Sequence, residues 1–180
     1  IKNVRKLIVR VFEINTFNFY SRNLYPVNTA INLDGLAATR EKAYNYDERP
    51  LRRIERNFNF PELKKRGVYV VEFIGNGRSS RALISKGNLR VLEDTGSAGH
   101  EFRVLDEDNK ACPQATLWLS GNEYKADEDG LIVVPFSNRP GRQTIVLRNG
   151  YFSALASFVH QKETYSLDAG IYVDREALIT

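Results

Sequence analysis

Short strand-like runs separated by turn residues constrain the fold of this 180-residue chain more than any other feature. In the first half, the apolar run 68–74 and the returning segment 81–85 flank Asn76 and Gly77, a dipeptide that favours a type I′ hairpin turn. The second half contains five such runs with Gly, Asn, Asp and Pro between them: HEFRVLDE, ATLWLS, LIVVPF, TIVLR and FSALASFV. This spacing predicts an all-β, antiparallel β-sandwich architecture.

Two further segments of the first half have strand character. The segment 7–15 alternates imperfectly, whereas 54–60 alternates with period two and places Ile54, Phe58 and Phe60 on one face. Each half therefore has enough predicted strands for a sandwich of its own. No segment has the pattern of a long amphipathic helix, and 60–66 is expected to form at most one helical turn.

The charge changes sign near the middle of the chain. Residues 1–86 contain 17 Lys and Arg against 8 Asp and Glu, whereas residues 87–180 contain 9 against 14. Because the change coincides with a short Gly-containing connector after the hairpin, it predicts a basic sandwich over 1–86 and an acidic one over 87–171. Residues 172–180 would then begin a further domain or form a C-terminal strand. A single domain with one basic and one acidic face is the alternative.

The basic cluster of the first half offers the best candidate binding site. Four arginines lie within eight residues, followed by the basic run 64–66, and aromatic residues are interleaved with them. Arginines neutralise phosphates and aromatic rings stack on bases, so this pattern permits a polyanion site. Interspersed glutamates dilute the charge, which argues against nucleic acid and favours an acidic partner, including the neighbouring net-negative half of the chain. The predicted binding residues are Arg49, Arg52, Arg53 and Arg56.

Catalytic and metal-binding patterns are not found in the sequence. His100 and His160 are the only histidines, and neither stands in a motif with a nucleophile or with metal ligands. The acidic stretches 106–110 and 127–130 lack the spacing of an EF-hand and are expected to form turns. Cys112, the only cysteine, excludes an intrachain disulfide and is expected to be a buried, inert thiol. We expect no enzyme activity, no cofactor and no metal.

The strand and turn patterns resemble those of macroglobulin-type domains in α2-macroglobulin-like proteins. The resemblance lies in FPELKKRGVYVVEFIGNGRSSRALISKG, in the sandwich pattern FRVLDEDNKACPQATLWLSGNEYKADEDGLIVVPF, and in YVDREALI as the opening strand of a further domain. It implies tandem macroglobulin- or immunoglobulin-like sandwiches within a longer protein that continues past Thr180. The thioester motif of that family, Gly-Cys-Gly-Glu-Gln, is not present around Cys112.

These observations predict a non-catalytic structural or protein-binding segment of a larger macroglobulin-like protein, which could serve as a protease-inhibitor scaffold. The resemblance implies an extracytoplasmic location and contacts with neighbouring domains or other proteins. The sequence has no methionine and no apolar run of about 20 residues, so we expect a fragment that does not insert into a membrane. An independent module for glycan or another polyanion is the alternative, with Trp118 as a further residue of interest, although TLWLS reads as a buried strand.

Overall fold

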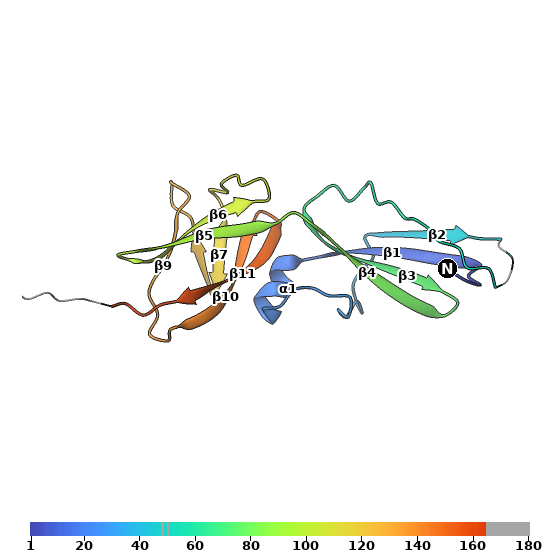
Figure 1. Cartoon of the computed structure of the whole chain (residues 1–180), viewed down its shortest axis with the longest axis horizontal. Helices are drawn as coiled ribbons and strands as arrows, with labels where there is room; N and C mark the ends of the chain where they lie inside the picture. Colours follow the sequence, from blue (N-terminus) through green and yellow to red (C-terminus); the bar gives the residue numbers. More distant parts are fainter. Residues whose placement is uncertain (48, 50, 165–180) are drawn as a thin grey trace, which may run out of the picture.

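The computed structural model describes residues 1–47, 49 and 51–164 and shows an elongated all-β protein with two groups of strands and one short helix (Figure 1). Every strand pairing is antiparallel, which confirms the predicted fold class. The elements are β1 (Lys6–Ile14), α1 (Thr16–Asn23), β2 (Arg40–Asn45), β3 (Gly67–Gly75), β4 (Arg78–Lys86), β5 (Leu89–Gly96), β6 (Gly99–Asp106), β7 (Thr116–Leu119), β8 (Asn122–Lys125), β9 (Ile132–Val134), β10 (Gly141–Asn149) and β11 (Phe152–His160).

The N-terminal unit is built on one four-stranded sheet in the order β2-β1-β3-β4. Both of its faces are apolar, because β1 and β3 alternate between two apolar clusters. One cluster, which includes Val9 and Val71, packs against side chains of the β2–β3 connection. The other, which includes Phe12 and Val70, packs against α1 and the α1–β2 connection. Strand β3 is consequently buried over its first six residues.

The second layer of this unit is extended chain rather than a strand ladder. In 54–60 the alternation follows the prediction, since Ile54, Phe58 and Phe60 are half-buried and the residues between them at 55, 57 and 59 are exposed. The segment does not form one of the named strands. At its start, Lys2 and Arg53 form an isolated bridge, and the predicted helical turn at 60–66 is a single turn closed by Leu63 N–H and Phe60 O.

The predicted hairpin is confirmed. Strands β3 and β4 pair without interruption from Gly67–Lys86 to Gly75–Arg78. Asn76 has φ 50° and Gly77 has φ 70°, the left-handed conformations that a two-residue type I′ turn requires.

Replacing Gly77 with valine is expected to lower the free energy of unfolding by about 1–2 kcal/mol. A β-branched residue is strained at φ 70°, although an added Cβ would meet no atom within 4 Å. Thermal or denaturant unfolding measures the effect. Ser80→Val, at an exposed strand position nearby, is the matched control and should be close to neutral. Equal stability of the two variants would contradict the turn assignment.

The sequence pattern did not predict helix α1. Asn15 caps its N-terminus by accepting a hydrogen bond from Asn18 N–H at 3.0 Å, and Leu24 ends the helix with φ 55°. With eight residues, two turns are too short for a helical period to stand out from the neighbouring strand pattern. The helix exists because its buried side chains, Thr16 and Tyr20, pack against the rest of the protein.

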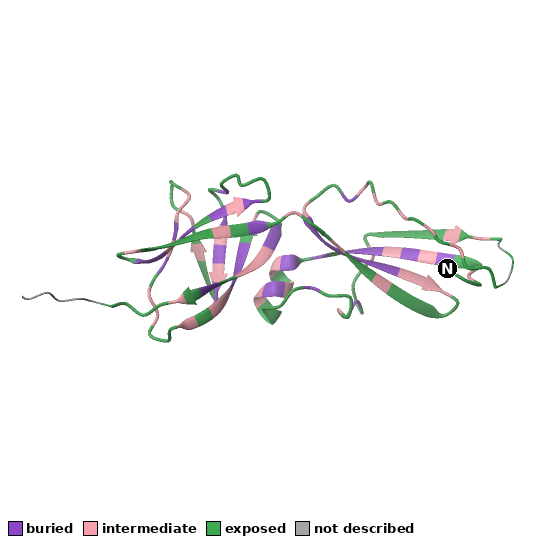
Figure 2. Ribbon diagram, in the orientation of Figure 1, coloured by how far each residue is buried: buried purple, intermediate pink, exposed green. Residues whose placement is uncertain are grey.

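The second unit is a sandwich of two sheets in the orders β11-β10-β7-β8 and β5-β6-β9. Their facing sides form one apolar core, drawn in purple in Figure 2. The large side chains that are fully buried in this core come from both sheets and include Phe102, Leu117, Ile132, Ile145 and Leu147.

Helix α1 connects the two units by packing on the outer face of sheet β11-β10-β7-β8. Val146 of β10 is fully buried in the same apolar cluster as Phe12 and Tyr20. Ser153 N–H donates to Thr16 Oγ1 at 3.1 Å in a buried position, and the Arg148 guanidinium lies 4.8 Å from the centre of the Phe17 ring. The two units therefore share an apolar cluster.

Trp118 belongs to this junction and not to the sandwich core. Leu117 and Leu119 of β7 face the core, so the strand's alternation turns Trp118 to the outer side, where it is half-buried against the shared cluster. Trp118 therefore packs against an apolar cluster, as a buried strand predicts, but at the junction of the two units and not between the two sheets of the sandwich. Strand β4 ends at Lys86 and β5 begins at Leu89, but the division into 1–86 and 87–171 stays a prediction, and 172–180 lies outside the described residues.

Candidate binding surface at the basic end

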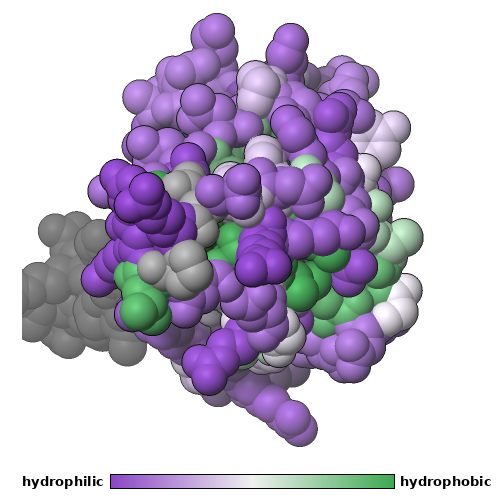
Figure 3. All heavy atoms as spheres, turned by 90° about the vertical axis from the view of Figure 1, so that its right-hand side faces the viewer, coloured by the Kyte–Doolittle hydropathy of each residue, from purple (hydrophilic) through white to green (hydrophobic). Residues whose placement is uncertain are grey.

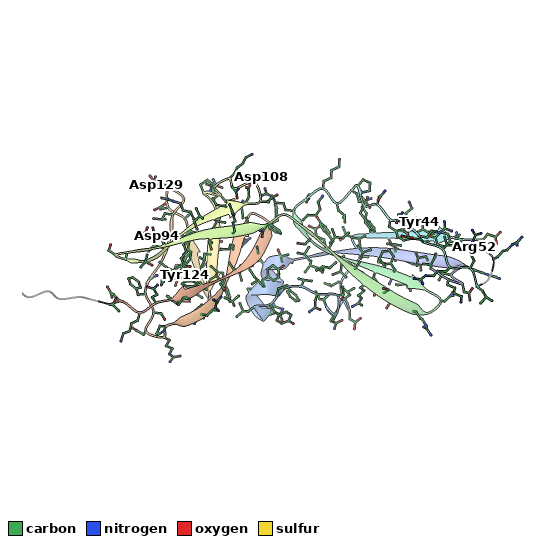
Figure 4. All side chains as sticks on the ribbon, in the orientation of Figure 1. Tyr44, Arg52, Asp94, Asp108, Tyr124 and Asp129 are labelled. Carbon is green, nitrogen blue, oxygen red and sulfur yellow. The ribbon has the colours of Figure 1, made fainter. Side chains whose placement is uncertain are left out.

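The predicted arginines lie in the β2–β3 connection, and Arg52 lies at the end of the N-terminal sheet that is remote from the second unit (Figure 4). Arg49, Arg52 and Arg53 are exposed. Arg56 is half-buried and lies with its guanidinium carbon 4.6 Å from the centre of the Tyr46 ring. The structure thus directs three of the four predicted residues to solvent at one tip of the molecule and uses the fourth in packing.

Backbone hydrogen bonds fix the conformation of this tip. The Ile1 amino group donates to Ile54 O at 2.6 Å, and Ile54 N–H donates back to Ile1 O at 2.9 Å. The side-chain oxygen of Asn3 accepts from Leu51 N–H at 2.5 Å, and the backbone oxygen of Asn3 accepts from the Asn76 side-chain amide at the β3–β4 turn. The arginine-bearing segment is therefore tied to the N-terminal residues and to the hairpin.

Folding brings further cations to the same tip that sequence proximity could not reveal. Lys2 pairs with Arg53 in an isolated bridge, Lys6 begins β1 opposite the end of β2, and Arg78 follows the hairpin turn. The acidic residues described near the tip are Asp47 and Glu55. Figure 3 views this end and shows a mainly hydrophilic surface. We call this surface the basic end and define it by its exposed cations: Lys2, Arg5, Lys6, Arg49, Arg52, Arg53 and Arg78.

The aromatic residues interleaved with the cluster pack within the protein. The rings of Tyr44 and Tyr46 are nearly parallel at 6.5 Å, and the Phe58 ring meets Tyr44 edge-on at 5.4 Å. Lys42 Nζ lies 4.9 Å from the centre of the Tyr44 ring, and Arg56 covers Tyr46. Because these rings are engaged by protein groups, they do not form an open platform for stacked bases.

The basic run 64–66 lies apart from the basic end, at the junction of the two units. Arg66 pairs with Asp106 at 3.0 Å and with Glu107 at 2.9 Å, which raises the pKa of the arginine. Chiefly the backbone N–H of Lys110, and then the Arg66 guanidinium, hold the pKa of Asp106 below its usual value. The basic residues of this part of the sequence are therefore divided in the structure. Those at the tip are exposed, whereas Arg66 forms ion pairs with the second unit. The neighbouring acidic unit meets Arg66 and not the predicted arginines.

The two histidines meet in the second unit. Their ring centres are 5.4 Å apart, beside the rings of Phe136 and Phe158. His100 is fully buried, its Nε2 accepts from Gln161 N–H at 3.0 Å, and its Nδ1 lies 3.4 Å from Glu93 Oε1. Burial lowers the pKa of His100, against the opposing effect of the Glu93 carboxylate. A neutral ring that accepts a backbone N–H is a structural group holding the end of β11.

The acidic stretches form turns, as predicted. Asp106 Oδ1 accepts from the N–H groups of Asp108 and Lys110, and Asp127 Oδ1 accepts from those of Asp129 and Leu131. Among residues 1–47, 49 and 51–164, no group of three His, Cys, Asp or Glu side chains could hold a metal ion. Cys112 is buried, and burial raises the pKa of its thiol and keeps it protonated.

Comparison with known proteins shows which domains and proteins the chain is similar to. Residues 7–87 match the family model of the AbpF first immunoglobulin-like domain. Over this range the chain is therefore similar to an immunoglobulin-like domain. Actin-binding protein F of Dictyostelium discoideum is 41% identical over 186 aligned residues, which cover 99% of this chain and 8% of that protein. The chain thus spans only a small part of this curated relative.

The fold also resembles that of a macroglobulin. A crystal structure of native alpha-2-macroglobulin from Escherichia coli, spanning domains MG0-NIE-MG1, matches with a TM-score of 0.50 at 13% identity and covers 86% of this chain and 55% of that chain. At this identity the likeness concerns the fold alone. It supports the macroglobulin-like architecture but gives no specific support to protease inhibition.

These comparisons correct the expected location and support a general class of function. The predicted extracytoplasmic location is wrong, because the 41% identical relative is named as an actin-binding protein, and actin is a cytoskeletal protein of the cell interior. Immunoglobulin-like domains are generally non-catalytic, so a binding or structural module is the class of function that the comparisons support. In the part of the chain that the structure describes, no helix has the length and apolar character needed to cross a bilayer.

Proposed function

We propose that this chain is a non-catalytic binding segment of an actin-binding protein and that its basic end contacts an acidic protein surface. The observation that carries the proposal is the exposure of Arg49, Arg52 and Arg53 in one segment, with Arg52 at the tip remote from the acidic unit (Figure 4). The cations nearby on the N-terminal residues and after the hairpin enlarge the same surface. The relative's name supplies actin as the candidate partner.

The physical properties of the basic end suit protein recognition. Arginine presents a planar fork of donors that binds carboxylates in a bidentate manner, and the segment that carries Arg52 and Arg53 is held by hydrogen bonds to Ile1 and Asn3. The tip therefore loses little conformational freedom when it binds. Exposed charges act over about 8 Å at physiological ionic strength, so the contact should weaken as salt rises.

Cosedimentation with filamentous actin tests this proposal. We expect the 180-residue chain to pellet with filaments at low salt. The double variant Arg52→Glu and Arg53→Glu should bind at least tenfold more weakly, because two charges are reversed and the net charge falls by about four units. The matched control is Arg139→Glu with Arg142→Glu, which makes the same change at exposed positions of the second unit. Failure of the unaltered chain to pellet, or equal losses in both variants, would refute the assignment.

A module for glycan or another polyanion is the second candidate, because the same exposed arginines could bind sulfate or phosphate groups. A heparin oligosaccharide and single-stranded and duplex oligonucleotides distinguish it when titrated at about 0.15 M salt, where the screening length is about 8 Å. We expect binding of oligonucleotides to vanish under these conditions. Micromolar affinity for any of these probes that is lost in the Arg52→Glu and Arg53→Glu variant, without binding to actin, would favour the second candidate.

A further inference from the structure

The outer strand of the N-terminal sheet, β4, has an uncovered edge. It is the last strand in the order β2-β1-β3-β4, and among the described strands it pairs with β3 alone, along its full length. Figure 2 shows that much of its ribbon is exposed. A strand of nine residues without proline or bulge presents a row of backbone donors and acceptors to a further strand.

The opposite edge of the same sheet is protected and β4 is not. Strand β2 has six residues and carries Arg40, Glu41 and Lys42, and charged side chains on a short edge strand discourage further pairing. In the central part of β4, from Ser79 to Ser85, the one charged side chain is Arg81, which is bound to Glu72 at 3.0 Å. The two edges of this sheet therefore differ in their capacity to accept another chain.

The hairpin defines which backbone groups of β4 point outward. A two-residue turn is closed by a hydrogen-bonded pair, here Gly75 and Arg78, and hydrogen-bonded pairs alternate with open pairs along an antiparallel ladder. We therefore expect the residues at alternate positions to direct their N–H and C=O groups away from β3. These residues are Ser79, Arg81, Leu83 and Ser85.

Apolar surface flanks this edge on both faces of the sheet. On one face, a groove of 370 Å³ is lined by Ile84 of β4 and by side chains of the β2–β3 connection, including Phe58, Phe60 and Leu63. On the other face, Leu83 is 39% exposed although it is a large apolar residue. A strand added to β4 would place alternate side chains over the groove and beside Leu83.

We propose that β4 accepts an extended acidic segment of a partner protein by strand addition. Charge complementarity identifies the partner's chemistry, because β4 contains Arg78, Arg81 and Lys86 and no acidic residue. Arg81 is bound to Glu72. Arg78 and Lys86 place one positive charge at each end of the edge, and the Lys86 ammonium also donates to Leu63 O. The same cations disfavour pairing of β4 with β4 of a second copy, since like charges would then face each other.

A synthetic peptide with the sequence DVTVSVTVD is a suitable probe. Valines alternate with hydroxyl residues and aspartates stand at both ends, so the peptide matches the edge in either direction. We expect nuclear magnetic resonance titration of the 180-residue chain to show slowed amide exchange at Ser79, Arg81, Leu83 and Ser85, without slowing in β2. The same peptide with alternate backbone nitrogens methylated should lose this effect, because it cannot form the ladder.

Two variants locate the site on the protein. Leu83→Glu places a carboxylate in the middle of the edge and should weaken binding of the acidic peptide at least tenfold, whereas Leu92→Glu makes the same change at an exposed leucine of β5 and should leave binding unchanged. Ser85→Pro removes one outward donor and keeps Leu83, so it should weaken binding even if Leu83→Glu disturbs the fold.

Three results would overturn the proposal. The first is a lack of spectral change at millimolar peptide. The second is exchange protection centred on Arg52 and Arg53 instead of β4, which would assign the peptide to the basic end. The third is dimerisation through β4 without peptide, measured by sedimentation velocity, which would make a second copy the occupant. The proposal does not depend on actin binding, because the actin experiment alters residues at the tip and not on β4.

Discussion

Replacing Ile145 with aspartate is expected to lower the free energy of unfolding by about 3–5 kcal/mol, the cost of a buried charge without a partner. Ile145 is fully buried between the two sheets of the second unit, among side chains such as Phe102, Leu117 and Phe158. A carboxylate there would lose its hydration and would have to be protonated or to open the sandwich. The measurement is denaturant unfolding followed by circular dichroism.

Val159→Asp is the matched control for this variant. Val159 lies on β11 with 51% of its surface exposed, so the same change should alter stability by no more than about 0.5 kcal/mol. A loss of stability in Ile145→Asp that does not exceed the loss in the control would show that the two sheets do not pack as described.

Truncating Phe12 to alanine should also destabilise the chain by about 3–5 kcal/mol, because it leaves a cavity in the cluster shared by the two units. Phe12 is buried with Tyr20 of α1 and Val146 of β10. Trp118 packs against the same cluster and is the only tryptophan, so its fluorescence reports on the junction. We expect the variant to shift Trp118 emission to longer wavelength as the junction loosens.

Phe73→Ala provides the comparison within the same sheet. Phe73 packs on the opposite face, in the cluster that includes Val9 and Val71, and is only partly buried. Its truncation should destabilise the N-terminal unit without changing the emission of Trp118. If neither variant or both variants moved the emission, the shared cluster would not be the contact that couples the units.

The two oppositely charged halves of the sequence lie at opposite ends of the elongated molecule. Arg52 lies at one extreme of the long axis and Asp94 near the other, with Asp108 and Asp129 also on the second unit (Figure 4). Among the described residues, the ion pairs that join the two units are those of Arg66 with Asp106 and Glu107. The basic end is therefore exposed at a distance from the acidic unit, whereas the ion pairs of Arg66 join the two units.

The sequence alone determined those features that depend on neighbours in the chain. The hairpin at Asn76 and Gly77 was predictable because a type I′ turn needs residues that tolerate positive φ. The strands of the second unit were predictable because their apolar runs are bounded by turn residues, and the acidic turns followed from the tendency of Asp to bind N–H groups shortly after it. The exposure of three arginines in one segment also agreed with their charge.

Only the tertiary structure decided how distant segments combine. Helix α1 depends on packing against β10 and β11, so eight residues of sequence did not reveal it. The alternation of β7 was visible in the sequence, but only the packing of both units decides that Leu117 and Leu119 face the sandwich core and that Trp118 faces the junction with α1. The gathering of Lys2, Lys6 and Arg78 at the same tip as Arg53 depends on strand register. The pairing of β1, β3 and β4 brings the hairpin to the N-terminal residues, where Asn76 binds Asn3, 73 positions away in the chain.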